Sequence, residues 1–538
     1  MSATTAWETT EAADGEPRTL WEFIERTVAR HGEAPALALR DAEPEIRWSY
    51  RDLAREIDKA AGHLAARGIG RGDRVLFWGA NRPQWGAAFF ALFRLGAVVV
   101  PLDYRSAPDF IQRVAEKTRP KALLVDRALS EGFKPEVGPR ILVEELSDEA
   151  GAAADLPAHE GGPDDVVEIV FTSGTTGEPK GVMITNRNLL ANVRAIDRVI
   201  QIHPYYRLVS LLPLSHLFEQ IALVVVVGAG ASTVYLQSLR PASIMEAIRQ
   251  ERATCMIAVP QVLDLFLSGI EREVRRAGKQ KQWELLHRVA RRLPFGLRKY
   301  LFRPLHEKLG GRFEFFVSGG AALDPELGQR WENMGIKVLQ GYGTTEAAPA
   351  VAATRLDDRS METVGWSVEG IELKLAPDGE VLIRGPQLTP GYWENPEATA
   401  AAFEDGWYHT GDLGELDRRG RLRLRGRKKN MIALANGLNV YPEDVESALR
   451  LSPAVKDAVV VGLKRGRADI DVHAVLVMHE PGRAEEVVKA ANRRLAPHQQ
   501  IRGHTVWPEE DFPRTLTMKP RRPPIEQRLK EMGVGETA

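Results

Sequence analysis

Cysteine is almost absent from this sequence, whose 538 residues include only Cys255. A lone cysteine cannot form an intrachain disulfide, and it excludes a zinc site built from several thiolates. The apolar residues around it, 253–259, predict a small buried side chain and not a nucleophile. Such sparing use of cysteine is typical of a reducing compartment, so we expect a cytoplasmic protein.

The chain also lacks an excess of charge of either sign, because 72 lysines and arginines stand against 73 acidic residues. No global field would draw it to nucleic acid, and we expect no such partner. Long apolar runs are missing too: residues 221–227 form a run of only seven, where a membrane-spanning helix needs about twenty. That run predicts a buried strand or helix. Residues 1–19 have no signal-peptide pattern and predict a disordered tail.

Two common nucleotide-binding signatures are missing as well. The pattern G-x-G-x-x-G does not occur; Gly68 and Gly70, for example, are followed by Asp73. This absence disfavours a dinucleotide-binding fold. The loop G-x-x-x-x-G-K-[ST] would need glycine where the chain has Pro179, and serine or threonine directly after Lys180.

What the sequence does contain is a segment rich in hydroxyl groups and glycine at 171–181, Phe-Thr-Ser-Gly-Thr-Thr-Gly-Glu-Pro-Lys-Gly. The apolar run 166–171 predicts a strand before it and the spacing of 186–200 predicts a helix after it, so we expect the loop between a strand and a helix. Glycines let the backbone approach an anion, hydroxyls donate hydrogen bonds and lysine adds positive charge. The alternative is a flexible Ser/Gly turn. The candidate phosphate-binding residues are Thr172, Ser173, Gly174, Thr175, Thr176, Gly177 and Lys180.

Two later segments, 315–323 and 337–346, each run from an apolar strand pattern into small residues. Small residues at a strand end leave room for a planar ring against the backbone. Tyr342 offers a ring for stacking and Glu346 a hard oxygen of the kind that Mg²⁺ prefers. In isolation the second segment would favour a turn followed by a solvated carboxylate, but its position after the phosphate loop favours a binding role. The candidate binding residues here are Gly320, Ala321, Gly341, Tyr342, Gly343, Thr344 and Thr345.

The order of helical and strand patterns predicts an α/β fold. From 20 to 126 the two alternate, which indicates parallel sheets covered by helices. Residues 379–385 and 421–425 alternate as antiparallel strands do, so a small β-rich subdomain follows the large N-terminal domain. After 430, a helical pattern at 442–449 and strand patterns at 455–462 and 471–478 predict a small α+β domain.

The segment 271–312 is unusually basic, with 13 lysines and arginines against 4 glutamates. Its apolar stripe predicts one or two amphipathic helices broken near 294–296. Such helices could lie on an anionic lipid surface, or their stripe could dock on the protein's own domain. The stripe consists of Trp283, Leu286, Ala290, Leu293, Leu297, Tyr300 and Leu301.

Together these motifs closely resemble those of the adenylate-forming enzymes, which include acyl-CoA synthetases, luciferases and peptide-synthetase adenylation domains. The resemblance runs from about Leu20 to about Lys530, and residues 211–220 look like the long-chain fatty acyl branch. It implies a synthetase that joins a fatty acid to CoA through an acyl-AMP, using ATP and Mg²⁺. A ligase that loads an acyl-carrier protein, an aryl-acid ligase and an inactive membrane-associated binding protein stay open as alternatives. A homodimer is also left open.

The resemblance implies roles for single residues in the first part of the chain. Lys180 and its loop would grip the β- and γ-phosphates, and Thr345 would lie near the α-phosphate. Glu346 and Thr175 would hold Mg²⁺. His216, which alone would more often be a satisfied core histidine, would line the acyl pocket.

Further roles follow in the second part. Asp412 and Arg427 would contact the ribose, and Lys519 would act catalytically between the carboxylate and the α-phosphate. Residues 427–429, with Lys429 as the hinge, would separate the adenylating domain 20–426 from a mobile domain 430–538. The chain departs from the family's pattern at Met518, where glycine is usual, and at Ala433, where many relatives have lysine.

Overall fold

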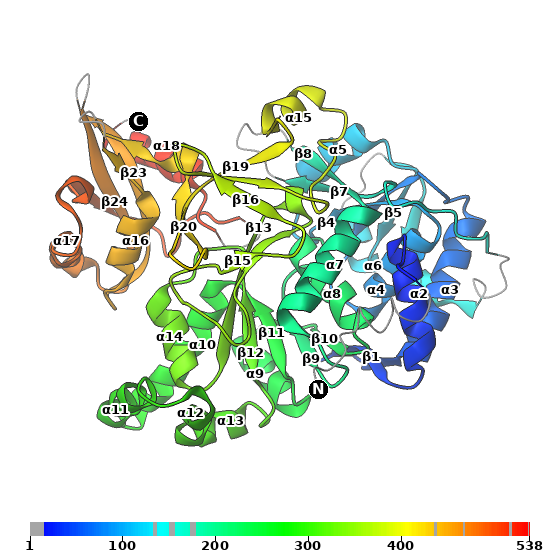
Figure 1. The fold of residues 1–538 in the computed structure, drawn as a ribbon, viewed down its shortest axis with the longest axis horizontal. Helices are drawn as coiled ribbons and strands as arrows, with labels where there is room; N and C mark the ends of the chain where they lie inside the picture. Colours follow the sequence, from blue (N-terminus) through cyan, green and yellow to red (C-terminus); the bar gives the residue numbers. More distant parts are fainter. Residues whose placement is uncertain are drawn as a thin grey trace. The chain divides into compact units, whose positions relative to one another are not determined.

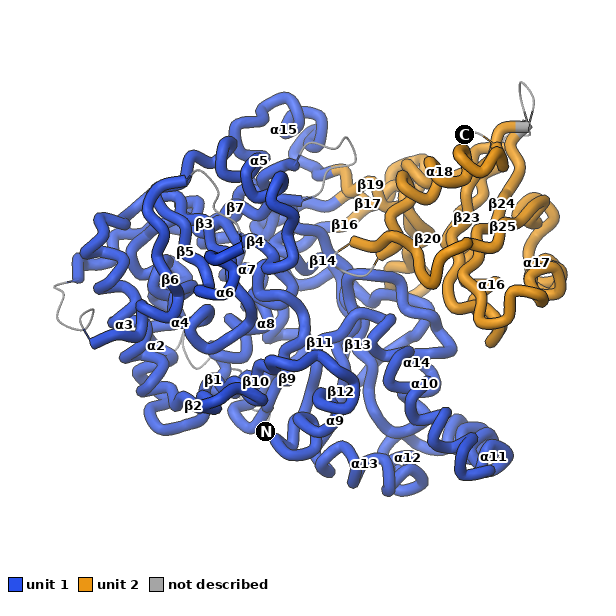
Figure 2. The backbone as a smooth tube through the Cα atoms, turned by 180° about the vertical axis from the view of Figure 1, so that it is seen from behind, with its two compact units in different colours: residues 1–372, 383–408 blue, residues 373–382, 409–538 orange. Residues whose placement is uncertain are grey.

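The structure is a computed structural model that describes residues 15–132, 137–149, 156–172, 179–434, 438–465, 469–515, 519–535 and 537. It divides into two compact units (Figure 2). Unit 1 comprises Met1–Glu372 and Ile383–Tyr408, and unit 2 comprises Leu373–Leu382 and His409–Ala538. The predicted boundary at 427–429 stays a prediction. The predicted loop residues Ser173, Gly174, Thr175, Thr176 and Gly177, together with Met518, lie outside the described residues.

Unit 1 contains two sheets whose central strands are parallel. In the described part of the chain, the larger has the order β15 (Trp366–Ser367), β14 (Ala350–Ala353), β13 (Lys337–Gly343), β12 (Phe315–Ser318), β11 (Cys255–Ala258), β9 (Arg207–Ser210), β10 (Ser232–Leu236), β1 (Pro35–Arg40) and β2 (Ile46–Ser49). Pairing is parallel from β13 to β1 and antiparallel at both edges.

The smaller sheet has the order β6 (Arg140–Leu142), β5 (Ala122–Val125), β3 (Arg74–Trp78), β4 (Val98–Leu102), β7 (Val166–Thr172) and β8 (Lys180–Thr185). Its strands are parallel except for β8, which runs antiparallel to β7. The predicted α/β class with parallel sheets is therefore confirmed.

The expectation that the glycine-rich loop lies between a strand and a helix is wrong. The strand β8 intervenes, so the loop joins the two strands of a hairpin, and the helix α7 (Asn186–Ile200) begins only after β8. The signal in the sequence was a short apolar run, Val182, Met183 and Ile184, of which Val182 and Ile184 are buried in β8. Thr185 then caps α7 by accepting a hydrogen bond from the backbone N–H of Asn188.

Helices cover both sheets, and α7 and α8 lie side by side (Figure 1). Before the basic segment they are α2 (Leu20–His31), α3 (Tyr50–Ala66), α4 (Pro83–Arg94), α5 (Pro108–Thr118), α6 (Arg127–Gly132), α7, α8 (Leu217–Gly228) and α9 (Pro241–Gln250). After it come α14 (Pro325–Asn333) and α15 (Pro396–Ala402).

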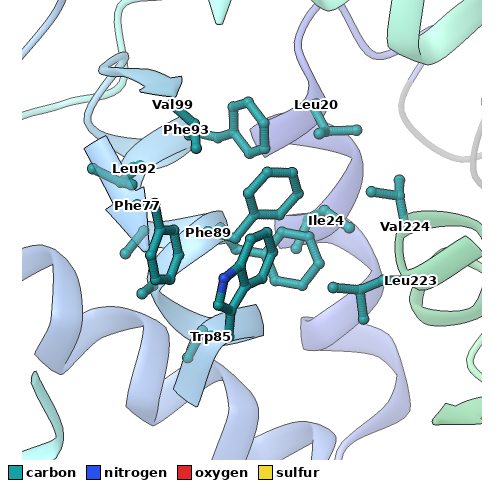
Figure 3. Close-up of a cluster of buried hydrophobic side chains, with 14 of the residues drawn as sticks. Leu20, Ile24, Phe77, Trp85, Phe89, Leu92, Phe93, Val99, Leu223 and Val224 are labelled. Atoms are coloured by element: carbon teal, nitrogen blue, oxygen red, sulfur yellow. The ribbon is translucent and has the colours of Figure 1, made fainter. Parts of the chain in front are cut away.

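The largest hydrophobic core lies around α4 (Figure 3). The rings of Trp85 and Phe77 stack with centroids 4.5 Å apart, and Phe89 meets Phe93 edge to face at 4.6 Å. The helix α8 adds Leu223 and other side chains to this core from one face, while its opposite face belongs to a second core. A helix that is apolar on all sides is buried on all sides, so the prediction for 221–227 is confirmed.

Two further predictions concern membranes and Cys255. Among the described residues, no helix combines the length and apolar character that crossing a membrane requires. Cys255 is buried in β11, and burial raises the pKa of its thiol to about 12. The prediction of a buried side chain is confirmed, and the raised pKa disfavours a nucleophilic role.

The basic segment 271–312 has more helices than predicted. It holds the end of α10 (Pro260–Arg276) and then α11 (Gln280–Ala290), α12 (Phe295–Leu301) and α13 (Arg303–Lys308), grouped beside α14 in Figure 1. The predicted break falls between α11 and α12. Ala290 is fully buried, and Trp283, Leu286 and Leu301 pack against the core. By contrast, Leu297 and Tyr300 stay exposed, so only part of the stripe docks on the protein's own domain.

The last third of the chain is β-rich and then mixed, as predicted. A five-stranded sheet in the described residues contains β16 (Glu372–Leu375), β17 (Glu380–Arg384), β18 (Phe403–Glu404), β19 (Trp407–Leu416) and β20 (Leu422–Arg427). Unit 2 continues with β21 (Ile432–Ala433), β22 (Asn439–Val440), α16 (Pro442–Arg450), β23 (Val455–Arg465), β24 (Asp469–Met478), α17 (Ala484–Asn492), β25 (Gly503–Val506) and α18 (Arg522–Glu531). The strands β23, β24 and β25 form its central sheet.

Candidate functional site

Several predicted residues of unit 1 lie at or just after the carboxyl ends of parallel strands. Carboxyl ends of parallel strands meet at one edge of a sheet, where ligands of α/β proteins commonly bind. Gly341 and Gly343 lie at the end of β13, Glu346 follows in the next short turn, and Gly320 lies just after β12. A Cβ atom placed on Gly319 would lie 2.9 Å from the ring of Phe218 and 3.3 Å from the carbonyl oxygen of Gly341. The segments that carry His216, Gly320 and Gly341 are therefore neighbours at this edge.

Glu346 lies in a tightly held turn, the 3₁₀ helix Thr345–Ala347. The fully buried amide of Asn192 on α7 donates to the Ala347 carbonyl at 2.7 Å and accepts from the backbone N–H of Ala350 at 2.9 Å. The N–H of Thr389 donates to the Glu346 carbonyl at 2.8 Å. Buried hydrogen bonds on both sides thus fix the backbone that carries the carboxylate.

Glycine is required at 343 for the same turn. A Cβ atom there would lie 1.9 Å from the carbonyl oxygen of Pro349, closer than any side chain can approach. Gly341, two residues earlier, faces open space, with nothing within 4 Å of a Cβ placed on it. The side-chain oxygen of Thr344 is buried and has no hydrogen-bond partner within the described residues. The turn therefore combines open space with an unsatisfied hydroxyl, as a site for a polar ligand should.

Lys180 and Glu346 are joined through Tyr392, which the sequence analysis did not single out. The Tyr392 hydroxyl donates to Oε1 of Glu346 at 2.9 Å. The ammonium of Lys180 lies 5.2 Å from the centre of the Tyr392 ring, within cation–π range. Burial, followed by the negative charge of Glu346, raises the pKa of Tyr392, so this hydroxyl keeps its proton at neutral pH.

A single carboxylate is the metal donor that this site offers. No cluster of three or more histidine, cysteine, aspartate or glutamate side chains suitable for a metal occurs in the part of the chain that the structure describes. Mg²⁺ commonly binds through one or two carboxylates together with substrate phosphates and water. Glu346 therefore fits Mg²⁺ that is brought with a nucleotide, and does not fit an all-protein metal cage.

His216 is neither solvent-exposed nor a buried core residue. It precedes the first turn of α8 as its N-cap residue, and about a third of its side chain, 35%, is exposed. Its Nε2 atom lies 3.8 Å from the carboxylate of Asp103, which is itself buried and held by two hydrogen bonds from the Arg105 guanidinium. A partly exposed polar side chain beside a fixed carboxylate can line a pocket.

In unit 2, three predicted residues come together. Asp412 on β19 pairs with Arg427 on β20, and their side chains form an ion pair at 2.7 Å. Lys519 is exposed to solvent. Desolvation, followed by the positive charge of Arg427, lowers the pKa of Lys519, and Asp412 acts in the opposite direction. The three charges therefore lie close enough to influence one another.

Lys429, the predicted hinge residue, lies next to this cluster in a short 3₁₀ helix, Lys428–Asn430. Burial and the charge of Arg427 lower its pKa. The stretch of β19 just before Asp412 is held by Glu380, whose Oε1 accepts from the backbone N–H of Gly411 at 2.9 Å. The other oxygen of Glu380 accepts from Lys428 at 2.9 Å. One buried carboxylate thus connects the strand at Asp412 with the residue before Lys429.

Four residues that position others were not predicted from the sequence. They are Asp103, Asn192, Glu380 and Tyr392, and each lies far in sequence from the residue that it contacts. None belongs to a recognisable motif. The one available signal was a polar residue inside an apolar or turn-forming stretch, which does not reveal its partner.

Comparison with known proteins gives matches over nearly the whole chain. Residues 24–393 match the family model described as AMP-binding enzyme, and residues 429–532 match that of the AMP-binding enzyme C-terminal domain. The chain is 31% identical to a long-chain-fatty-acid–CoA ligase of Mycobacterium bovis, over 76% of this chain and 74% of the relative. It is 29% identical to an indoleacetate–CoA ligase of Aromatoleum aromaticum, over 90% and 94%.

Among solved structures, the o-succinylbenzoate CoA synthetase of Bacillus subtilis, in complex with its acyl-adenylate intermediate, is 25% identical with a TM-score of 0.78. The alignment covers 95% of this chain and 98% of that one.

The two glycines of the turn provide a matched test of the geometry. We expect Gly343→Ala to lower the free energy of unfolding by about 2 kcal/mol or more, because the new methyl group would clash with the Pro349 carbonyl. Gly341→Ala should change it by less than about 0.5 kcal/mol, since its methyl group enters open space. Thermal denaturation of both variants checks this. Equal melting temperatures would contradict the close approach at Gly343.

Proposed function

Because this chain belongs to the AMP-binding enzyme family, we propose that it is an ATP-dependent acyl-CoA synthetase. Its substrates would be a fatty acid, ATP and CoA, and its products acyl-CoA, AMP and pyrophosphate. One observation carries the proposal. The side chains of Lys180 and Glu346, which lie 166 residues apart in sequence, are joined through Tyr392 at the sheet edge where Gly341 leaves open space.

Adenylation solves a chemical problem, because a carboxylate is a poor electrophile. In the first half-reaction a carboxylate oxygen attacks the α-phosphorus, the bond from that phosphorus to the bridging oxygen breaks, and pyrophosphate leaves. Lys180 and the hydroxyls of Thr172 and the adjoining loop would stabilise the charge that develops on the leaving group. Thr345 and Lys519 would orient the reacting oxygens.

Mg²⁺ would be held by Glu346, with Thr175 as a second candidate, and would supply positive charge against the phosphates. Adenine would lie against Gly320, Ala321 and Gly341–Thr344, with Tyr342 as a stacking partner. Asp412 and Arg427 would contact the ribose. For the adenine site, the open space at Gly341 and the unsatisfied hydroxyl of Thr344 support this assignment.

In the second half-reaction the sulfur of CoA, after losing its proton, attacks the acyl carbonyl carbon, and the bond to the AMP oxygen breaks. Lys519 has no task in this step, and its removal from the acyl group would open a path for the thiol. We assign the hinge for such a movement to Lys429, with residues 430–538 as the mobile domain.

A fatty acid of medium or long chain is the proposed acid. Residues 211–220 have the form of the long-chain branch, and the Mycobacterium bovis relative is named for such substrates. His216 would line the acyl pocket. The Aromatoleum relative is named for an aromatic acid, so an aryl-acid ligase is the second candidate, and a ligase that loads an acyl-carrier protein is the third.

The defining experiment incubates the purified protein with ATP, Mg²⁺, CoA and a panel of carboxylic acids, followed by mass spectrometry of the products. We expect pyrophosphate, AMP and acyl-CoA with medium- or long-chain fatty acids. Acyl-AMP that accumulates with CoA present and disappears only with an acyl-carrier protein would favour the carrier-loading alternative. If none of the acids on the panel led to pyrophosphate release, the synthetase assignment would be contradicted.

Lys519 separates the two half-reactions. We expect Lys519→Ala to slow acyl-AMP formation by at least about 100-fold, because the attacking carboxylate loses its positive partner, while supplied acyl-AMP is still converted to thioester. Lys489→Ala is the matched control, since the side chain of that lysine is exposed on α17 and forms a surface ion pair with Glu485. If Lys519→Ala slowed both half-reactions equally, the role of Lys519 would be wrong.

Peripheral membrane contact through 271–312 is a further part of the proposal. Four apolar side chains of α11 and α12 are largely exposed, Leu285 at 54%, Val289 at 41%, Leu297 at 51% and Tyr300 at 67%. Arginines and lysines outnumber acidic residues around them. An exposed apolar row among basic side chains fits an anionic lipid surface.

We expect the double variant Leu297→Ser, Tyr300→Ser to bind vesicles of phosphatidylcholine and phosphatidylglycerol about tenfold more weakly than the wild type, since two inserting side chains are lost. The control is Tyr205→Ser, an exposed apolar side chain outside the segment. Co-sedimentation at low and high salt measures both. No sedimentation of the wild type at low salt would exclude this membrane contact.

A further inference from the structure

Tyr392 is fixed in place from two sides although it belongs to no nucleotide-binding motif. Its backbone forms a bridge to Val182 on β8, and the N–H of Trp393 donates to the carbonyl of Gly181 at 2.7 Å. On the other side, the buried amide of Asn188 on α7 donates to the carbonyls of Pro386 and Leu388, both at 2.8 Å. The segment that carries Tyr392 is thus tied to the strand of Lys180 and to the helix that holds the Glu346 turn.

The ring and the hydroxyl of Tyr392 contact different groups. The ring faces the ammonium of Lys180, and the hydroxyl donates to the carboxylate of Glu346. Tyr408, on the neighbouring β18–β19 hairpin, lies close enough to Tyr392 and Glu346 to interact electrostatically with both. Two tyrosines therefore lie near one carboxylate. Burial, then the charge of Glu346, raises the pKa of Tyr408, so it also keeps its proton.

We propose that Tyr392 is a positioning residue that sets both the phosphate-binding lysine and the metal-binding carboxylate, with Tyr408 supporting its hydroxyl. This inference rests on the proposed function, in which Lys180 and Glu346 hold Mg·ATP. An ionised carboxylate has about four acceptor positions, so hydrogen bonds from tyrosine leave others for Mg²⁺. A carboxylate held in one rotamer loses less conformational entropy when the metal binds.

The proposal separates into two measurable effects. Loss of the hydroxyl alone should weaken the metal step, because Glu346 loses the donor that orients it. Loss of the ring should also weaken binding of the metal-free nucleotide, because Lys180 loses the surface that directs its ammonium. If Tyr392 merely filled space, phenylalanine would fill the same space, and its substitution would change neither the metal step nor the binding of metal-free nucleotide.

The test is calorimetric titration of ATP into the full chain, once with EDTA and once with excess Mg²⁺. For Tyr392→Phe we expect the gain in affinity on adding Mg²⁺ to fall about tenfold, with the EDTA affinity within about twofold of the wild type. Tyr408→Phe should lower the same gain by a smaller factor. Tyr392→Leu should in addition weaken ATP binding in EDTA by about threefold to tenfold.

Tyr206→Phe is the matched control. Tyr206 is also buried and contacts another tyrosine, Tyr205, but it lies just before the amino end of β9, away from the carboxyl ends of the strands. An unchanged Mg²⁺ gain in both Tyr392→Phe and Tyr408→Phe would overturn the proposal. So would a loss for Tyr392→Phe that is equal with and without Mg²⁺. If Tyr392→Phe does not fold, Tyr408→Phe decides. A wild type that binds no ATP, or binds it without regard to Mg²⁺, would instead contradict the proposed function itself.

Discussion

The backbone contact between β8 and residues 391–393 is the interaction on which the candidate site of unit 1 depends. The strand β8 is the last strand of its sheet, paired with β7 on one side. On its other side Met183 donates to the Gly391 carbonyl at 3.1 Å, and Gly181 accepts from Trp393. These bonds cover an exposed strand edge. They also place the side chain of Tyr392 between Lys180 and Glu346. The arrangement of those two groups therefore depends on main-chain pairing.

Local patterns predicted the elements but not their long-range partners. Alternating helix and strand patterns gave the parallel sheets, and the apolar run 221–227 gave a buried element, because burial on all sides leaves a compositional signal. The strand β8 was missed because it follows a loop whose composition dominates the segment. Asn192 and Tyr392 act on residues more than forty positions away, and spacing along the chain carries no information about such contacts.

Glu168 is a residue whose environment could not be predicted from the sequence although its strand could. It lies inside the run that predicted β7, in full burial, where a charged group would be costly. Burial raises its pKa to about 8, and a hydrogen bond from Gln220 at 2.7 Å satisfies one oxygen. The sequence suggested a strand despite this residue, and the structure shows why the strand tolerates it: the side chain is largely neutral below that pH.

In unit 2, by contrast, a carboxylate lies among positive charges, since Asp412 is surrounded by the cations of Arg427, Lys429 and Lys519. Their combined charge favours an anionic ligand.

Both faces of the helix α8 are buried, and this limits where the sequence of this protein can change. One face of the helix packs in the core around α4 and the other in the core around Cys255, while His216 stands at its first turn. Substitutions along the helix body would disturb one core or the other, whichever face they changed. Variation in substrate range among descendants of this sequence should therefore accumulate in the connecting residues 211–216 and in the loops at the sheet edge, and the helix itself should drift slowly.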